Sequence, residues 1–112
     1  MKTLSVKHPW CELIATGKKT IEIRSWKTDY RGPLLIVSSL KPTWELSGKA
    51  VCIVDLVKIR KIKETDADAS CCTEACIDDY AWILENARPC EHIPVKGKLM
   101  LYETDMEDRH KQ

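Results

Sequence analysis

Short strand-like segments, separated by glycine and proline turns, constrain this chain most. Residues 19–26 alternate between apolar and polar side chains, as a half-buried strand does. Residues 34–39, four apolar residues followed by two serines, read as a buried strand. Residues 49–61 read as a long strand with apolar side chains of one parity, and residues 4–6 suit a short first strand. A Gly-Pro step and a Ser-Gly step mark turns between them. This spacing of short strands predicts a small, closed or partly closed β-barrel.

One helix is predicted near the start of the chain. Residues 8–17 carry a two-turn helix signature, with a proline near the first helical position. Gly17 stands where a left-handed C-cap belongs. Trp10, Leu13 and Ile14 share one face of this helix, so we expect all three to pack on the core.

The second half of the chain gives weaker signals. Residues 64–70 are acidic and small, which is typical of a loop, and residues 73–79 suit a short helix. Periodicity does not decide between helix and strand for residues 80–86. Residues 99–103 predict a last strand, and residues 104–112 are a polar tail that we expect to fray.

Length and composition suit one globular domain. The 112 residues predict a single domain over 1–112, with its core at about 4–103. Hydrophobic residues make up 44% and charged residues 31%, and no apolar run approaches the about 20 residues of a membrane helix. Charge appears before any signal-peptide core develops, so we expect a cytoplasmic protein with six reduced cysteines. We expect no metal and no cofactor.

Charge is distributed unevenly along the chain. Residues 1–63 carry 13 Lys and Arg against 5 Asp and Glu, a balance of +8, and residues 64–112 carry 5 against 12, a balance of −7. A basic half can form a positive face that attracts phosphates. Alternatively, the two populations interleave in space and cancel. The total charge of only +1 argues against a protein that coats long nucleic acids nonspecifically.

Residues 17–24 read GKKTIEIR and fit the pattern G-x-K-x-x-E-x-R, the signature of the ASCH family within the PUA-like superfamily. LSVKHPW at 4–10, YAWILEN at 80–86 and IPVKGKL at 93–99 resemble further family segments in the right order. The resemblance covers roughly 4–103 and implies a small stand-alone member. It implies an α+β, mainly β fold: a barrel of five to six strands with two or three short helices beside a cleft. It also implies RNA binding.

Strand parity suggests what the motif can do. Glu22 and Arg24 lie two residues apart on one strand face, where they can pair, and the long side chain of Lys19 can reach them. Together they can hold a nucleobase edge or a phosphate. Trp26 or Trp10 can supply a stacking surface. The simpler alternative is an exposed ion pair of structural value only.

Three further residues are candidate ligand contacts. Ser5 and Ser38 line or end strands near the expected cleft, and His8 directly precedes the helix. His8 can equally be a helix-entry residue without any ligand contact. The predicted partner is RNA, a nucleotide or a modified nucleoside, bound through these residues and the motif.

An enzymatic function is the alternative. Some family members are similar to enzymes that remove the acetyl group from N4-acetylcytidine, or to ribonucleases. Lys19 would then act as general base, Glu22 would orient water, and an acidic residue such as Glu74 would carry a proton. In the bacterial amidohydrolases the position of Glu22 resembles a threonine, so the deacetylase assignment does not transfer cleanly.

Overall fold

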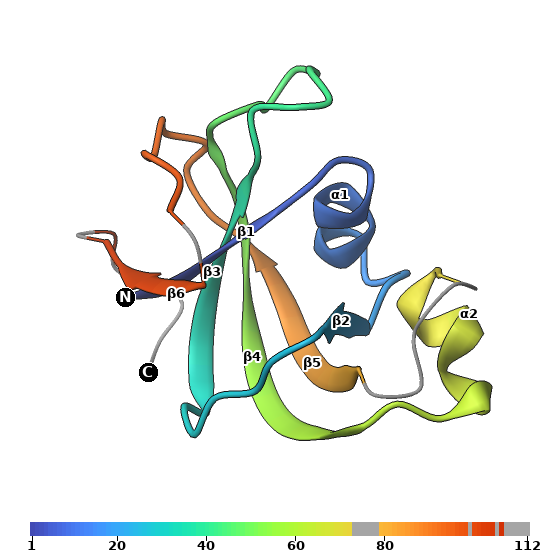
Figure 1. The fold of residues 1–112 in the computed structure, drawn as a ribbon. Coiled ribbons are helices and arrows are strands. Elements are labelled where there is room, and N and C mark those ends of the chain that lie inside the picture. The colour runs from blue at the N-terminus through green and yellow to red at the C-terminus, as the bar shows by residue number, and fades with distance from the viewer. Residues whose placement is uncertain (73–78, 99, 105, 107–112) are drawn as a thin grey trace.

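The computed structural model describes residues 1–72, 79–98, 100–104 and 106. These residues form one curled six-stranded sheet with short helices beside it, which confirms the expected mainly β fold (Figure 1). The strands and helices are β1 (Lys2–Val6), α1 (Trp10–Ala15), β2 (Ile21–Arg24), β3 (Gly32–Ser38), β4 (Ala50–Lys61), η1 (Glu64–Asp66, a 3₁₀ turn), α2 (Ala67–Ser70), β5 (Tyr80–Pro89) and β6 (Leu101–Glu103).

The sheet is a half-barrel with an open side. Its strand order is β2-β5-β4-β3-β1-β6, and the β1–β3 pair is parallel while the other pairs are antiparallel. β2 and β6 are therefore the two edges among the described residues. The curl brings β2 back toward β1 without a ladder of backbone hydrogen bonds between them. This seam between β1 and β2 positions the candidate site described below.

Both faces of the sheet bury apolar side chains. On the concave face, Trp82 of β5 packs with Cys11 and Ile14 of α1 and with the even-numbered apolar residues of β3. A smaller cluster on the other face contains Leu35 and Ile53. Because β3 is covered on both sides, its sequence reads as a continuous apolar run and not as an alternation.

The first helix is confirmed, with one correction. α1 ends at Ala15, and Gly17 adopts a left-handed φ of +81°, as a C-terminal cap requires. Ile14 is buried in the core, but the Trp10 side chain is 36% exposed. The prediction that Trp10 packs on the core is therefore wrong. Trp10 begins the helix, next to the open seam, where the core side chains do not reach it.

The loop predicted for residues 64–70 is also wrong, because these residues form η1 and α2. The Asp66 carboxylate accepts a hydrogen bond from the Lys63 backbone N–H at 2.7 Å, which holds the first turn. The same carboxylate forms a two-pronged pair with Arg60 of β4. The charge of Asp66 suggested an exposed loop, but its carboxylate instead stabilises the start of η1.

The remaining segments resolve as follows. Residues 80–86, undecided by periodicity, belong to β5, and the predicted last strand is present as β6. The helix predicted for 73–79 and the tail predicted for 104–112 lie mostly outside the described residues. No helix in the described part of the chain is long and apolar enough to cross a membrane.

Candidate functional site: a cationic cleft in the seam of the half-barrel

A cleft of about 530 Å³ lies along the seam between β1 and β2. Its walls come from β1, from the first residue of α1, from the segment around β2 and from a few more distant residues: Leu4, Ser5, Val6, Lys7, Trp10, Lys19, Glu22, Ile23, Arg24, Ser25, Trp26, Ser39, Cys72, Lys98 and Met100. Small-molecule sites commonly enclose about 300–1,000 Å³, so the cleft can take one small ligand or part of a larger one. The seam is open because β1 and β2 are not paired as strands, and side chains bridge it instead.

Local backbone geometry places Lys19 at the floor of this cleft. After the left-handed Gly17, the Lys19 N–H donates to the Leu13 carbonyl at 3.0 Å, which folds the chain back along α1. The next N–H, of Thr20, donates to the Ala69 carbonyl of α2 at 2.8 Å. The Lys19 side chain is therefore held on both sides and is only 3% exposed.

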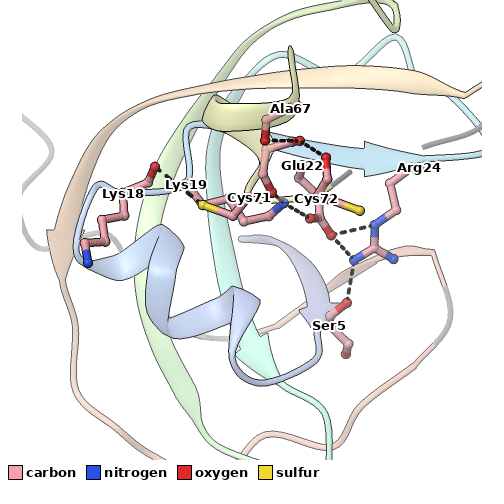
Figure 2. Close-up of polar contacts among 9 residues, drawn as sticks. Ser5, Lys18, Lys19, Glu22, Arg24, Ala67, Cys71 and Cys72 are labelled. Carbon is pink, nitrogen blue, oxygen red and sulfur yellow. Dashed lines mark hydrogen bonds and ion pairs between the residues drawn. The ribbon is translucent and has the colours of Figure 1, made fainter. Parts of the chain in front are cut away.

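The three charged motif residues converge on one carboxylate, as Figure 2 shows. Lys19 Nζ lies 3.3 Å from Glu22 Oε1, and Arg24 Nη2 and Nε lie 2.7 and 3.0 Å from Glu22 Oε2. Lys19 Nζ also donates to the Ser70 carbonyl at the end of α2. Glu22 is only 7% exposed, so two cations compensate its removal from water.

Arg24 bridges the seam and keeps an unused donor. Its Nη2 donates to the Ser5 carbonyl of β1 at 2.8 Å, which ties the two sides of the cleft together (Figure 2). Among the described residues, Nη1 of Arg24 has no protein partner, and the side chain is 23% exposed. A guanidinium presents five N–H donors in a planar fork, so a ligand can be bound without breaking the pair with Glu22.

Aromatic and apolar side chains form the rest of the cleft wall. Trp26 packs edge-on against the buried Trp82, with ring centroids 4.8 Å apart, and its carbonyl accepts from Trp82 Nε1 at 3.2 Å. These contacts fix the Trp26 ring at the cleft. Trp10 and Met100 are exposed apolar side chains that also line the cleft. An exposed indole beside cationic groups is a suitable surface for stacking a planar base.

Comparison with known proteins now identifies the family. A profile of the ASCH domain matches residues 4–102, nearly all of the chain. The chain belongs to the ASCH domain family. ASCH domains are PUA-like and are associated with RNA binding and processing.

Two kinds of relatives resemble this ASCH domain. Human Activating signal cointegrator 1 is 32% identical over 76 residues, which cover 67% of this chain but only 13% of that protein. The chain thus spans a small part of its length. A crystal structure of ASCH from Zymomonas mobilis has a TM-score of 0.61 and 16% identity, covering 84% of this chain and 73% of that one. A crystal structure of a point variant of the same protein has a TM-score of 0.61 and 17% identity, covering 83% of this chain and 72% of that one. These structures show the fold.

Not every candidate residue of this ASCH domain reaches the cleft. Ser5, with Lys19, Glu22, Arg24 and Trp26, lines it. The Ser38 hydroxyl instead accepts from Trp44 Nε1 at 2.7 Å, away from the lining. The His8 ring stacks on Trp44 with centroids 4.0 Å apart, and its buried Nδ1 has no hydrogen-bond partner among the described residues. Glu74 lies outside the described residues.

Sequence reasoning overlooked several cleft residues, among them two lysines and a cysteine. Lys7 and Lys98 add two cations to the lining, and Cys72 adds a thiol. Lys98 belongs to the IPVKGKL segment, one of the segments that resemble the family, and this resemblance was the one available signal for it. The cleft therefore contains four cationic side chains and one carboxylate among the described residues. This excess of positive charge favours an anionic ligand.

A larger cavity of about 950 Å³ is lined by Ile53 of β4, by residues that follow β5, and by Tyr102 and Glu103 of β6. Its lining is mainly apolar, with Ile53, Ile93 and Val95, and its charged residues are of both signs. Burial raises the pKa of the Cys90 thiol there to about 11, so the thiol stays protonated at neutral pH. Size alone does not identify the functional site, because the convergent polar groups lie in the smaller cleft.

Proposed function

We propose that this ASCH domain is a binding module that captures a nucleotide or a short single-stranded RNA in the cleft. The observation that carries the proposal is the combination of four cations, one buried carboxylate and exposed indole surface around 530 Å³ of open volume. A nucleotide offers the complementary parts: a phosphate, hydrogen-bonding base edges and a planar ring.

The groups suit different parts of such a ligand. Arg24 Nη1 and the Lys7 and Lys98 ammonium groups suit a phosphate, because each can donate without losing a structural contact that holds the cleft. Glu22 suits a base edge with an exocyclic amine. In the described part of the chain its Oε1 pairs with Lys19 alone, and a carboxylate oxygen has room for a second donor. Trp10 suits stacking on the base.

Lys19 fits the role of a positioning residue better than that of a general base. Its nitrogen donates to the Ser70 carbonyl and forms an ion pair with Glu22, so two structural contacts already hold it in place. A general base must turn a lone pair toward a substrate proton, which would break the ion pair with Glu22. This arrangement favours a binding function over an enzymatic one, whether hydrolysis of a modified nucleoside or cleavage of RNA.

The experiment is a titration of the protein with the four nucleoside 5′-monophosphates and a mixed-sequence RNA hexamer, monitored by the fluorescence of the cleft tryptophans and by calorimetry. We expect saturable binding that weakens with salt and falls at least tenfold in Arg24→Gln, because the donor fork is lost. Arg31→Gln, which removes an exposed arginine that does not line the cleft, is the matched control and should bind within twofold of the parent.

Two outcomes would contradict the proposal. One is no binding of any of these ligands at low salt. The other is release of cytidine from N4-acetylcytidine, or cleavage of the hexamer, in a reaction that Lys19→Met abolishes while the melting temperature stays within a few degrees. That result would establish the enzymatic alternative, with Lys19 as a reacting group.

A further inference from the structure

The larger cavity and the cleft meet at shared residues. Lys98 lines both of them. Ser5 lines the cleft, where its carbonyl accepts from Arg24, and its hydroxyl forms a 3.1 Å hydrogen bond with the hydroxyl of Tyr102, which lines the larger cavity. Gly97 packs against this boundary, because a Cβ there would lie 3.4 Å from the Ser5 hydroxyl oxygen. The two spaces are therefore neighbours that share the side of one lysine.

The larger cavity has an apolar floor over the smaller core cluster. Ile53 belongs to that cluster, and Val95 and Met106 pack against it. Ile93, another apolar side chain of the lining, is 41% exposed. The volume of about 950 Å³ falls within the range of about 300–1,000 Å³ that small-molecule sites occupy. An exposed apolar surface inside such a hollow indicates a ligand with an apolar face.

The charged groups of this cavity differ in what already pairs with them. The Glu103 carboxylate lies 2.9 Å from Lys2 Nζ and 3.2 Å from the N-terminal ammonium. The second carboxylate of the lining is that of Glu91. Neither the Lys96 nor the Lys98 side chain has an ion pair or a hydrogen bond in the described part of the chain. Lys98 therefore offers an ammonium group to an anion at the boundary between the two spaces.

We infer that the larger cavity is a second nucleoside subsite, which takes the base next to the one in the cleft while Lys98 binds the phosphodiester between them. This inference rests on the proposed function and narrows its ligand to a single strand of at least two nucleotides. A phosphodiester joins neighbouring nucleosides, and lysine binds it as a point charge without reading a base. The apolar floor contacts the faces of a base and not its edges, so this subsite adds affinity that does not depend on sequence.

The test titrates the parent protein with three kinds of probe: the nucleoside 5′-monophosphate that binds best, the 5′-phosphorylated RNA dinucleotide with that base twice, and the same dinucleotide with one base removed at either position. We expect the intact dinucleotide to bind about tenfold more tightly than the monophosphate, because a second base is buried. Each abasic dinucleotide should bind at least about threefold more weakly than the intact one. Between 50 and 200 mM salt, the slope of log affinity against log salt should be steeper for the dinucleotide by about 0.7, for the additional phosphate.

Matched variants separate the larger cavity from the cleft. Val95→Trp narrows the cavity from a half-buried lining position and should reduce the difference between dinucleotide and monophosphate to about threefold or less. Val57→Trp is the control, because Val57 is exposed on β4 and lines neither space, and it should keep the full difference. Lys98→Gln should weaken dinucleotide binding more than monophosphate binding, whereas Lys7→Gln, which changes the cleft alone, should weaken both by the same factor. A thermal melt of each variant verifies that it is folded.

The outcomes distinguish this inference from the proposed function. Equal affinity of the parent protein for monophosphate and dinucleotide, or for the intact and the abasic dinucleotides, would overturn the second subsite while leaving the cleft as a nucleotide site. Neither of these results depends on a variant. Equal effects of Val95→Trp and Val57→Trp in folded protein would also overturn the second subsite. Failure of the parent protein to bind any of the probes at 50 mM salt would overturn both the subsite and the proposed function.

Discussion

Two buried carboxylates, Glu22 and Asp66, have similar surroundings and different consequences. Glu22 is 7% exposed and Asp66 4%, and each pairs with an arginine. Arg60 meets Asp66 with two nitrogens, Nη1 and Nη2, each 2.8 Å from a carboxylate oxygen. At Glu22 the arginine is Arg24, whose Nη1 has no partner among the described residues and which lies beside open volume.

The two ion pairs differ in which hydrogen-bonding groups remain available for a ligand. The Asp66 oxygens accept hydrogen bonds from Arg60 and from the Lys63 backbone N–H. Asp66 lines neither of the two cavities described above. The hydrogen bond from Arg60 first, and then that from Lys63, lower the pKa of Asp66 below its usual range. A buried ion pair is thus weak evidence for a binding site by itself. Adjacent volume and an unused donor make the stronger evidence.

The largest expected effect is on folding at Asp66. Asp66→Ala leaves Arg60 without its partner and removes the cap of η1, so we expect the free energy of unfolding to fall by about 3 kcal/mol. Urea unfolding measures this loss. Asp68→Ala, at an exposed neighbouring acid, should change it by less than about 0.5 kcal/mol. A comparable loss in both variants would show that general charge, and not the Arg60 pair, stabilises this segment.

At Glu22 we expect the larger consequence in binding. Glu22→Gln keeps the shape of the side chain but weakens the hold on Arg24 and Lys19, which should lower nucleotide affinity about tenfold, or about 1.4 kcal/mol. Calorimetric titration measures it. Glu45→Gln, at an exposed carboxylate outside the cleft, is the control. The comparison fails if Glu22→Gln binds normally and loses as much stability as Asp66→Ala.

A smaller, pH-dependent effect should distinguish Asp66 further. Because its pKa is lowered in the folded state, the stability it contributes is full above the unfolded carboxyl pKa of about 4 and is lost as pH falls through the folded-state pKa. The difference in unfolding free energy between the parent and Asp66→Asn should therefore be constant from pH 7 to 5 and shrink toward pH 3. Urea titrations at these pH values measure it, and an unchanged difference at pH 3 would contradict the assignment.

Local sequence patterns predicted the part of the site that local geometry controls. The alternation of residues 19–26 placed Glu22 and Arg24 on one face of β2, and their pairing follows from a two-residue spacing on any strand. Gly17 marked the end of α1 because few other residues adopt a positive φ there. Lys19 reached Glu22 because a long side chain at a helix–strand junction has only a short distance to cover.

Tertiary structure decided everything that depends on strands distant in sequence. Which edges of the sheet stay unpaired, and hence where the seam opens, follows from the strand order, which no local pattern encodes. That order brought Ser5 to Arg24, Lys98 to the cleft and Lys61 to the Tyr80 ring, and it left Trp10 exposed. Periodicity reports which face of an element is apolar, but only packing determines what that face meets.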